Sequence, residues 1–193
     1  MKHQLSYTIA LIALGMAGIA VSPAKAATVA AGPYYANPSW DQKLPASTRF
    51  VVLSNWNNEA VLDRETGLVW EKSPSSIGFS SDPNPLAQLP WNYVTSGCLA
   101  RKTGGRLGWR APTVDELLTL IDPIVPAPGP TLPTGHPFTN AQPSAYWTAT
   151  LQAGGSTSAF IVRFDIGGPD LRSTGVGTAL GWCVRGASHA QVY

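Results

Sequence analysis

The clearest periodic pattern in the chain lies near its middle and predicts a helix. Its apolar residues follow the i, i+3, i+4, i+7 spacing of one buried helix face: Val114, Leu117, Leu118 and Ile121. Thr113 and Glu116 match the Ser/Thr-x-x-Glu capping box, in which each side chain binds a backbone N–H of the other residue. We expect the helix to end at Asp122-Pro123, because proline restricts the residue before it and donates no hydrogen bond.

Another helix is predicted earlier in the chain, over residues 91–102. Its apolar face carries Trp91, Val94, Cys98 and Leu99. Cys98 is therefore expected to point inward. Arg101 and Lys102 are expected in the last turn, where they would face the negative end of the helix dipole. The Gly104-Gly105 pair would then end the helix.

Short stretches rich in β-branched and aromatic residues predict strands on both sides of the helices. Residues 49–53 and the hairpin-like unit 60–72 come before them, and Gly67 supplies the positive φ that the turn of this unit often needs. Residues 146–150, 159–165, 171–178 and 181–186 follow. The segments 73–90 and 123–143 are rich in proline and predict irregular structure. This order of elements is typical of an α+β domain.

The first 26 residues match an export signal. A basic start is followed by an apolar run over 5–21 and by Ala24-Lys25-Ala26, an A-x-A cleavage site. We expect cleavage after Ala26, which leaves 27–48 as an irregular N-terminal segment, 49–187 as one domain and 188–193 as a tail. An uncleaved membrane anchor is the alternative. No second long apolar run follows, so we expect no membrane span after cleavage.

Charge and composition narrow the class of partner. The 193-residue chain has a formal charge of +2, and loss of Lys2 and Lys25 with the signal brings it to about zero. A near-neutral domain lacks the excess of Lys and Arg that is typical of nucleic-acid-binding proteins, so no nucleic acid is expected as a partner. The hydrophobic content of 44% is too high for a disordered chain.

The chain has two cysteines, Cys98 and Cys183. In an exported protein, an even number of cysteines indicates a disulfide. Such a bond would tie the helix of residues 91–102 to the last predicted strand. Two free thiols are the alternative.

Five of these segments carry recognisable motifs in a fixed order. They are Asp-x-x-Thr-Gly-Leu-x-Trp at 63–70, a helical Cys98, Gly-Gly-x-x-x-Trp-Arg-x-Pro-Thr-x-x-Glu-Leu at 104–117, Tyr-Trp-Thr-x-Thr at 146–150, and Cys-Val-Arg at 183–185. Together they resemble a bacterial extracytoplasmic domain family of unknown function, typified by the C-terminal domain of the Legionella collagen-like adhesin. The resemblance covers residues 49–186.

The resemblance implies an α+β, C-type-lectin-like fold, related to the domains of formylglycine-generating enzymes. In that fold two helices pack on short antiparallel strands, and a helix-to-last-strand disulfide is a signature that Cys98 and Cys183 fit. Ligands usually meet the loops between the later strands, here residues 151–158 and 165–180. The collagen-like adhesin binds sulfated glycans, so the resemblance suggests an anionic glycan.

The sequence departs from the catalytic and calcium-binding relatives of this fold. Lectin calcium sites resemble Glu-Pro-Asn or Gln-Pro-Asp, whereas Gln142-Pro143-Ser144 lacks the acidic residue. A structural disulfide leaves no reactive cysteine pair for formylglycine-generating chemistry. His136 and His189 each stand alone, so neither a metal site nor a cofactor is predicted. A structural ion at Asp122, Asp165 or Asp170 is the alternative to solvated acids.

Two groups of charged residues are candidates for ligand binding. They are Arg101, Lys102 and Arg106 near the Gly-Gly turn, and Arg163, Asp170 and Arg172 in the later strands. Arginine suits sulfate and carboxylate because its planar guanidinium donates parallel hydrogen bonds. For the first group the alternative is dipole compensation and ion pairing, with Arg110 fixed inside the fold.

We therefore expect a secreted, cell-surface or periplasmic binding module that is not an enzyme. An anionic glycan or another surface polymer is the expected partner. The alternative is a structural or protein–protein interaction domain that uses the same face. Basic residues around an aromatic platform would favour the glycan, and an exposed apolar loop surface would favour a protein.

Overall fold

The computed structural model describes residues 44–186, apart from 77–78, 82 and 156. The predicted signal peptide, residues 27–43 of the N-terminal segment, and the tail lie outside this part, so the domain boundaries stay predictions. No helix within the described residues is long and apolar enough to cross a membrane.

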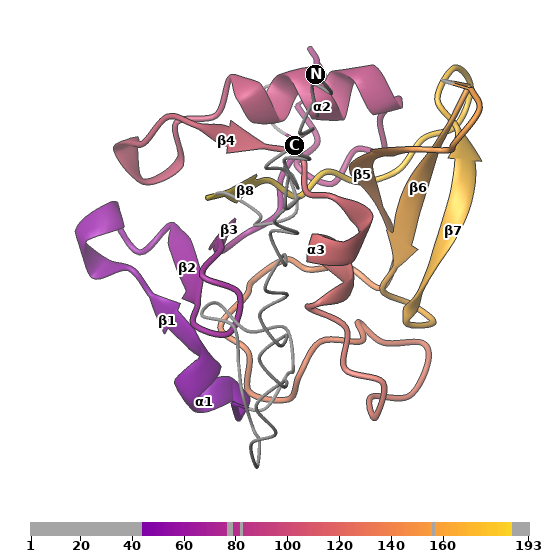
Figure 1. The fold of residues 1–193 in the computed structure, drawn as a ribbon. Coiled ribbons are helices and arrows are strands. Elements are labelled where there is room, and N and C mark those ends of the chain that lie inside the picture. Colours follow the sequence, from indigo (N-terminus) through magenta and orange to yellow (C-terminus); the bar gives the residue numbers. More distant parts are fainter. Residues whose placement is uncertain (1–43, 77–78, 82, 156, 187–193) are drawn as a thin grey trace, which may run out of the picture. The chain divides into compact units, whose positions relative to one another are not determined.

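The described residues form short helices and strands joined by long loops (Figure 1). The helical elements are α1 (Ala46–Arg49), η1 (Ser54–Trp56), α2 (Trp91–Leu99), η2 (Thr103–Gly105) and α3 (Val114–Leu118), where η marks a 3-10 helix. The strands are β1 (Phe50–Val52), β2 (Ala60–Asp63), β3 (Val69–Glu71), β4 (Trp109–Arg110), β5 (Ala145–Leu151), β6 (Ser158–Arg163), β7 (Gly168–Ser173) and β8 (Val184–Arg185).

One sheet has the order β1-β2-β3-β8-β4, and its paired strands are all antiparallel. The β2–β3 hairpin turns at Gly67, whose φ of 71° is the left-handed conformation that the sequence predicted. β8 lies between β3 and β4, with Val184 opposite Trp70 and Arg185 opposite Trp109. The last strand therefore joins the hairpin to the strand that precedes α3.

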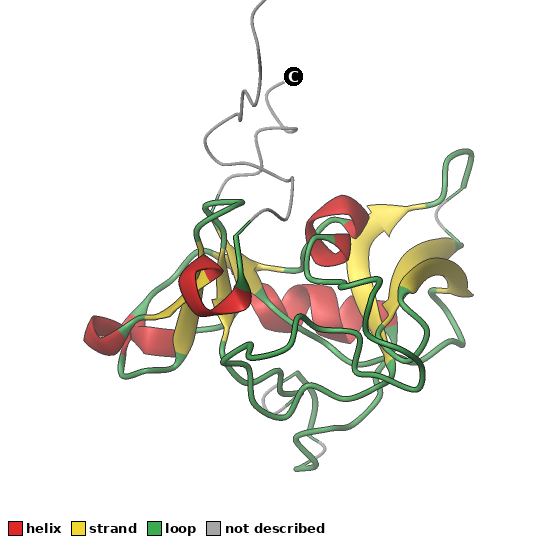
Figure 2. Cartoon of the chain, turned by 90° about the horizontal axis from the view of Figure 1, so that it is seen from below, coloured by secondary structure: helices red, strands yellow, loops and turns green. Residues whose placement is uncertain are grey.

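The other sheet is the antiparallel meander β5-β6-β7. It lies on the opposite side of α2 and α3 from β1–β3 (Figure 1). The proline-rich segment 123–143 contains no helix or strand and passes below α3, and Figure 2, the view from that side, shows mostly loops. β7 begins at Gly168, earlier than the predicted strand of residues 171–178, so it includes Asp170.

The core consists of two apolar clusters that meet at the β5–β6 sheet. Tyr146 and Val162 belong to one cluster, whereas their strand neighbours Trp147 and Ile161 belong to the other. Both faces of this sheet are therefore buried. Trp182 occupies the first cluster, fully buried, with its ring centroid 5.0–5.8 Å from those of Trp70, Phe138, Tyr146 and Phe164.

The capping box at α3 is confirmed. Thr113 accepts a hydrogen bond from the Glu116 N–H at 3.2 Å, and the Glu116 carboxylate accepts one from the Thr113 N–H at 2.8 Å. The helix is shorter than predicted, because it ends at Leu118 instead of at Asp122. The Asp122 N–H instead donates to the Thr131 carbonyl in the proline-rich segment.

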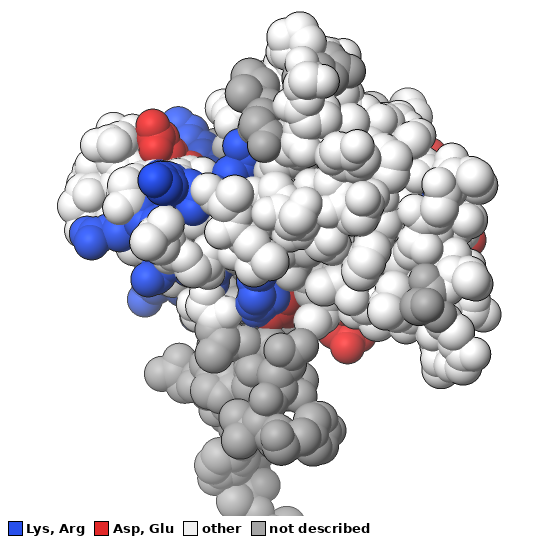
Figure 3. Space-filling model, turned by 90° about the horizontal axis from the view of Figure 1, so that it is seen from above, with Lys and Arg blue, Asp and Glu red and all other residues white. Residues whose placement is uncertain are grey.

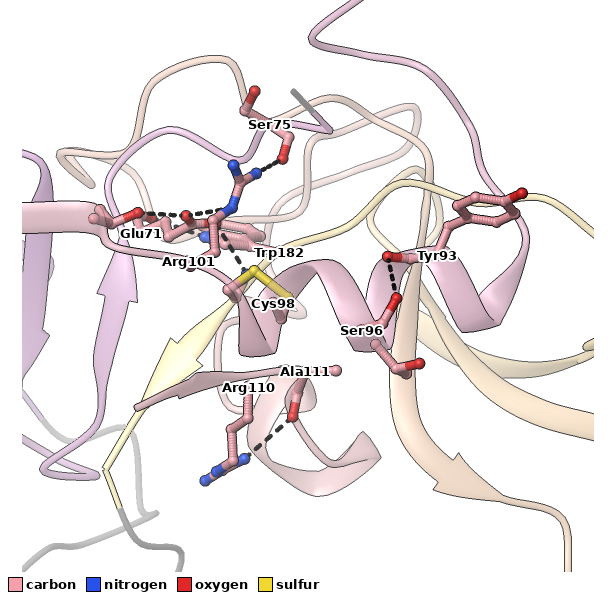
Figure 4. The surroundings of a disulfide bond; sticks show 12 residues. Glu71, Ser75, Tyr93, Ser96, Cys98, Arg101, Arg110, Ala111 and Trp182 are labelled. Carbon is pink, nitrogen blue, oxygen red and sulfur yellow. Dashed lines mark hydrogen bonds and ion pairs between the residues drawn. A yellow bond between two sulfur atoms is a disulfide. The ribbon is translucent and has the colours of Figure 1, made fainter. Parts of the chain in front are cut away.

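The prediction for α2 was wrong at its C-terminal end. The helix ends at Leu99, which is 69% exposed, and Arg101 and Lys102 lie beyond its last turn. The Arg101 guanidinium instead extends toward Glu71 and the Ser75 carbonyl (Figure 4). The contact with Glu71 in β3 thus determines where Arg101 lies, and the helical periodicity of the sequence does not.

The predicted disulfide is confirmed, since Cys98 in α2 is bonded to Cys183, one residue before β8 (Figure 4). Both cysteines are fully buried. The bond ties α2 to the last strand, as the resemblance to the C-type-lectin-like fold predicted. The helices α2 and α3, the short antiparallel strands and this disulfide confirm the predicted α+β fold class.

Candidate functional site: a basic surface and an adjoining polar pocket

Two short turns, η1 and η2, are packed against each other beside the five-stranded sheet. Gly104 in η2 has a φ of 64°, and a Cβ at this position would lie 2.7 Å from the Cβ of Trp56 in η1. The Glu59 carboxylate accepts a 2.7 Å hydrogen bond from the Gly104 N–H. Glycine is therefore required both by the backbone conformation and by the close approach of the two turns.

Trp56 is surrounded by cationic and aromatic side chains. The guanidinium carbons of Arg106 and Arg185 lie 5.4 and 5.3 Å from the centre of its ring, within cation–π distance. The Trp109 ring packs edge-on at 6.4 Å. Arg185 reaches Trp56 because β8 pairs with β4, and its Nε donates to the Leu107 carbonyl at 2.8 Å. With the exposed Lys102 at the start of η2, these residues form the basic surface: Trp56, Lys102, Arg106 and Arg185.

The basic surface carries uncompensated positive charge. Lys102, Arg106 and Arg185 make no ion pair with any carboxylate of the described residues. Figure 3 shows Lys and Arg side chains gathered on one part of the face seen from above, on the side where β4 lies. The rest of that face is largely uncharged. This part of the surface therefore attracts anions.

Arg101 and Arg110 form ion pairs with buried carboxylates, as the ion-pairing alternative predicted. Arg101 Nε lies 3.1 Å from Glu71, and the guanidinium covers the Phe79 ring at 4.2 Å. Arg110 binds both oxygens of Glu116, at 2.6 and 2.7 Å, and also the carbonyl of Gly186. These contacts fix both guanidinium groups.

An open pocket of about 400 Å³ adjoins the basic surface at η1 and η2. It is lined by Asn58, Glu59, Glu71, Lys72, Ser73, Ser75, Arg101, Thr103 and Thr139. Glu71 is only 3% exposed, and its burial raises the pKa of the carboxyl above the ordinary value, an effect that Arg101 and Thr103 oppose. We call this feature the polar pocket.

The second predicted group lies elsewhere, on β6 and β7. Arg163 forms a 2.5 Å ion pair with Asp165, and the nearby Asp170 offsets more of its charge. Arg172 donates to the carbonyl of Thr178. β6 and β7 are separated from β4 by α2 and α3 (Figure 1). The structure therefore does not bring the two predicted groups together, and the binding role of either group stays a prediction.

The candidate ion ligands are occupied by local contacts. Asp122 and Asp170 each accept a backbone N–H one or two residues away, and Asp165 binds Arg163. His136 Nδ1 accepts from the Phe138 N–H, and His189 lies outside the described residues. Within the part of the chain that the structure describes, no three His, Cys, Asp or Glu side chains are grouped to hold a metal ion.

Sequence reasoning missed Trp56, Arg185, Glu71 and Lys72 as site residues. Arg185 could have been found, because it alternates with the buried Val184 in the last predicted strand and must point the other way. Glu71 follows Trp70 in β3, and nothing in the local pattern indicates that its carboxylate is buried. Its burial depends on Thr103 and Cys183, which are distant in sequence.

Comparison with known proteins identifies the family. No curated protein matches the sequence. The family model described as the Lcl C-terminal domain matches residues 59–185, which reach from the residue before β2 to the last residue of β8. This match confirms the resemblance predicted from the motifs and favours an adhesin-like binding module. Since the matched residues make up more than half of the chain, the protein belongs to the Lcl C-terminal domain family.

Proposed function

We propose that this domain is a non-catalytic binding module for an anionic surface polymer, and that it binds through the basic surface. A sulfated or carboxylated glycan is the ligand class that fits best. The observation that carries the proposal is the pair Arg106 and Arg185 against the Trp56 ring, with the exposed Lys102 at the start of η2. None of these three cations has an acidic partner among the described residues. Family membership supports a binding role.

The geometry of the basic surface suits sulfate and carboxylate groups. Guanidinium groups bind such anions through two parallel N–H donors. Arg106 and Arg185 rest near the Trp56 ring, and Arg185 is also held by the Leu107 carbonyl. Side chains that are already ordered lose less conformational freedom on binding, which favours affinity.

The loops of β6 and β7 are the alternative location, and charge argues against them as a polyanion site. There, Asp165 and Asp170 both offset the charge of Arg163. At the basic surface, the Glu59 carboxylate accepts a hydrogen bond from the Gly104 N–H and forms no ion pair with Lys102, Arg106 or Arg185. The net field therefore favours an anion at η1 and η2.

A non-catalytic role is supported by the state of Glu71, the buried carboxyl of the polar pocket. Glu71 accepts from Thr103 and from the Cys183 N–H, and it is ion-paired with Arg101. Groups tied to each other and to the backbone are poorly placed to exchange protons with a substrate. We also place the protein outside the cytoplasm, because the predicted export signal and the disulfide both suit that location.

Binding to a polymer panel tests this proposal. The exported, disulfide-bonded protein is titrated with dextran sulfate, with hyaluronate and with uncharged dextran, each with calcium and with a chelator. We expect calcium-independent binding to the anionic polymers that weakens as salt screens the charges. Equal binding to uncharged dextran, or binding to none of the three, would contradict the proposal. The second result would move the search to protein partners.

A further inference from the structure

We propose that the polar pocket is a second, separate binding site, and that it takes an uncharged, hydroxyl-rich unit of about the size of one sugar ring. Its lining residues come from the turn after η1, the end of β3, the residues around η2, and Thr139 in the proline-rich segment. This inference goes beyond the proposed function, because it names a different ligand class at a different place. It holds whether or not the basic surface binds an anion.

The inner wall of the pocket is rigid and polar. Glu71 is held by the Thr103 hydroxyl at 2.7 Å, by the Cys183 N–H at 3.2 Å and by Arg101 at 3.1 Å. Arg101 in turn packs on Phe79 and donates to the carbonyl of Ser75 (Figure 4). The disulfide at Cys98 and Cys183 anchors both sides of this network. A ligand would therefore meet a preformed wall.

The charges that line the pocket balance each other. Glu59 and Glu71 are matched by Lys72 and Arg101. An anionic ligand would be opposed by the two carboxylates, and a cationic ligand by the ammonium and the guanidinium. A neutral ligand is repelled by neither set of charges. Its hydroxyl groups can donate hydrogen bonds to the carboxylates and accept them from the cations.

The outer wall offers polar groups whose side chains make no hydrogen bond or ion pair with the described residues. They are the Lys72 ammonium, the Thr139 hydroxyl and the Asn58 amide. Lys72 and Thr139 are held close together, because the Thr139 N–H donates to the Lys72 carbonyl at 2.8 Å. Water-facing donors and acceptors beside a rigid wall suit a polyhydroxylated ring.

Size and composition exclude other small ligands. The volume of about 400 Å³ lies near the lower end of the range for small-molecule sites. The lining residues include no aromatic side chain and no Leu, Ile or Val, so an aromatic or lipid ligand would gain little burial. A single pyranose ring combines a suitable size with many hydroxyl groups.

The test is a titration of the full chain, exported and disulfide-bonded, followed by backbone amide NMR. The probes are glucose, galactose, mannose and N-acetylglucosamine, each raised to tens of millimolar, since single-ring sugars are expected to bind with millimolar dissociation constants. At least one sugar should shift the amides of residues 58–59, 71–73, 103 and 139 in a saturable way. That binding should not depend on salt.

The decisive variant is Lys72→Met/Thr139→Val, which removes two outward polar groups and preserves side-chain size. We expect the sugar affinity to fall about tenfold, as the loss of two hydrogen bonds predicts. The matched control is Lys102→Gln/Arg106→Gln, which should keep sugar binding while weakening binding to dextran sulfate. If the proposed function were wrong and this inference right, the unmodified protein would bind the sugar but would not bind dextran sulfate.

Three results would overturn the inference. They are the absence of saturable shifts for every sugar, shifts that fall outside the polar pocket, and unchanged affinity in the Lys72→Met/Thr139→Val variant. Because this variant changes only partly buried or exposed side chains, its amide spectrum should remain that of a folded protein. If it does not fold, Thr139→Val alone serves the same purpose, with an expected loss of about threefold.

Discussion

The substitution Arg101→Met should destabilise the protein in a strongly pH-dependent way. Arg101 is the cationic partner of Glu71, and the two side chains are 16% and 5% exposed. Removal of one partner from a fully buried ion pair costs about 3–5 kcal/mol. Because Arg101 is partly solvated, we expect the free energy of unfolding at pH 7 to fall by about 2–3 kcal/mol.

The pH dependence follows from the direction of the Glu71 pKa. Burial already raises the pKa above its ordinary value, and Arg101 counteracts that shift, so removal of Arg101 raises the pKa further. A carboxyl whose pKa is higher in the folded state stabilises that state below the unfolded pKa, and this contribution is lost as pH rises through the folded pKa. At about pH 4 the variant should therefore lose only about 1 kcal/mol, from the lost stacking on Phe79.

Urea unfolding at about pH 4 and at pH 7, followed by tryptophan fluorescence, measures both values. The control is Arg101→Met made in a Glu71→Gln background, where no carboxylate remains to be left unpaired. There the cost of Arg101→Met should be the same at both pH values. An equal cost at both pH values with Glu71 present would refute the reasoning, since it would mean that the carboxylate is not the group that Arg101 stabilises.

Three further predictions concern the turns, the disulfide and His136. Gly104→Ala should lower the free energy of unfolding, measured with urea, by about 2–3 kcal/mol, because it adds a steric clash to an unfavourable φ. Gly105→Ala should cost about 1 kcal/mol, because Gly105 has a φ of 68° but open space around it. Equal costs would contradict the close packing of η1 and η2. Reduction of the disulfide, which spans 85 residues, should lower the free energy of unfolding by about 4–5 kcal/mol on the chain-entropy model, and a drop below about 1 kcal/mol would contradict that model here. Burial lowers the pKa of His136 below 6.5, so the thermal stability of the protein should fall as pH drops from 6.5 toward the folded pKa. The substitution His136→Gln should weaken this pH dependence. If the variant and the unmodified protein gave the same curve of Tm against pH, another group would be responsible.

The features that the sequence predicted correctly depend on residues close together in the chain. The capping box of Thr113 and Glu116 spans three residues, and the left-handed turn at Gly67 needs only its own conformation. The disulfide is non-local, but a sequence with two cysteines allows a single pairing within the chain. The fold class followed from the order of these local signals together with the family motifs.

The features that were missed depend on residues far apart in the chain. Arg101 leaves the helical path because Glu71, 30 positions earlier, attracts its guanidinium. The basic surface forms because β8 is paired with β4, which brings Arg185 beside Trp56. Charge clustering in the sequence identified Lys102 and Arg106 but did not indicate that Arg185, more than 70 positions later, lies beside them.

The measurement that tests the central claim most directly is the affinity for dextran sulfate across a range of salt concentrations. Two double variants that each remove two arginines are compared with the unmodified protein: Arg106→Gln/Arg185→Gln at the basic surface and Arg163→Gln/Arg172→Gln on β6 and β7. We predict that the first variant binds at least about tenfold more weakly at low salt, with a flatter salt dependence, and that the second stays within about twofold of the unmodified protein. The reverse pattern would place the polyanion site on the later strands and contradict the account.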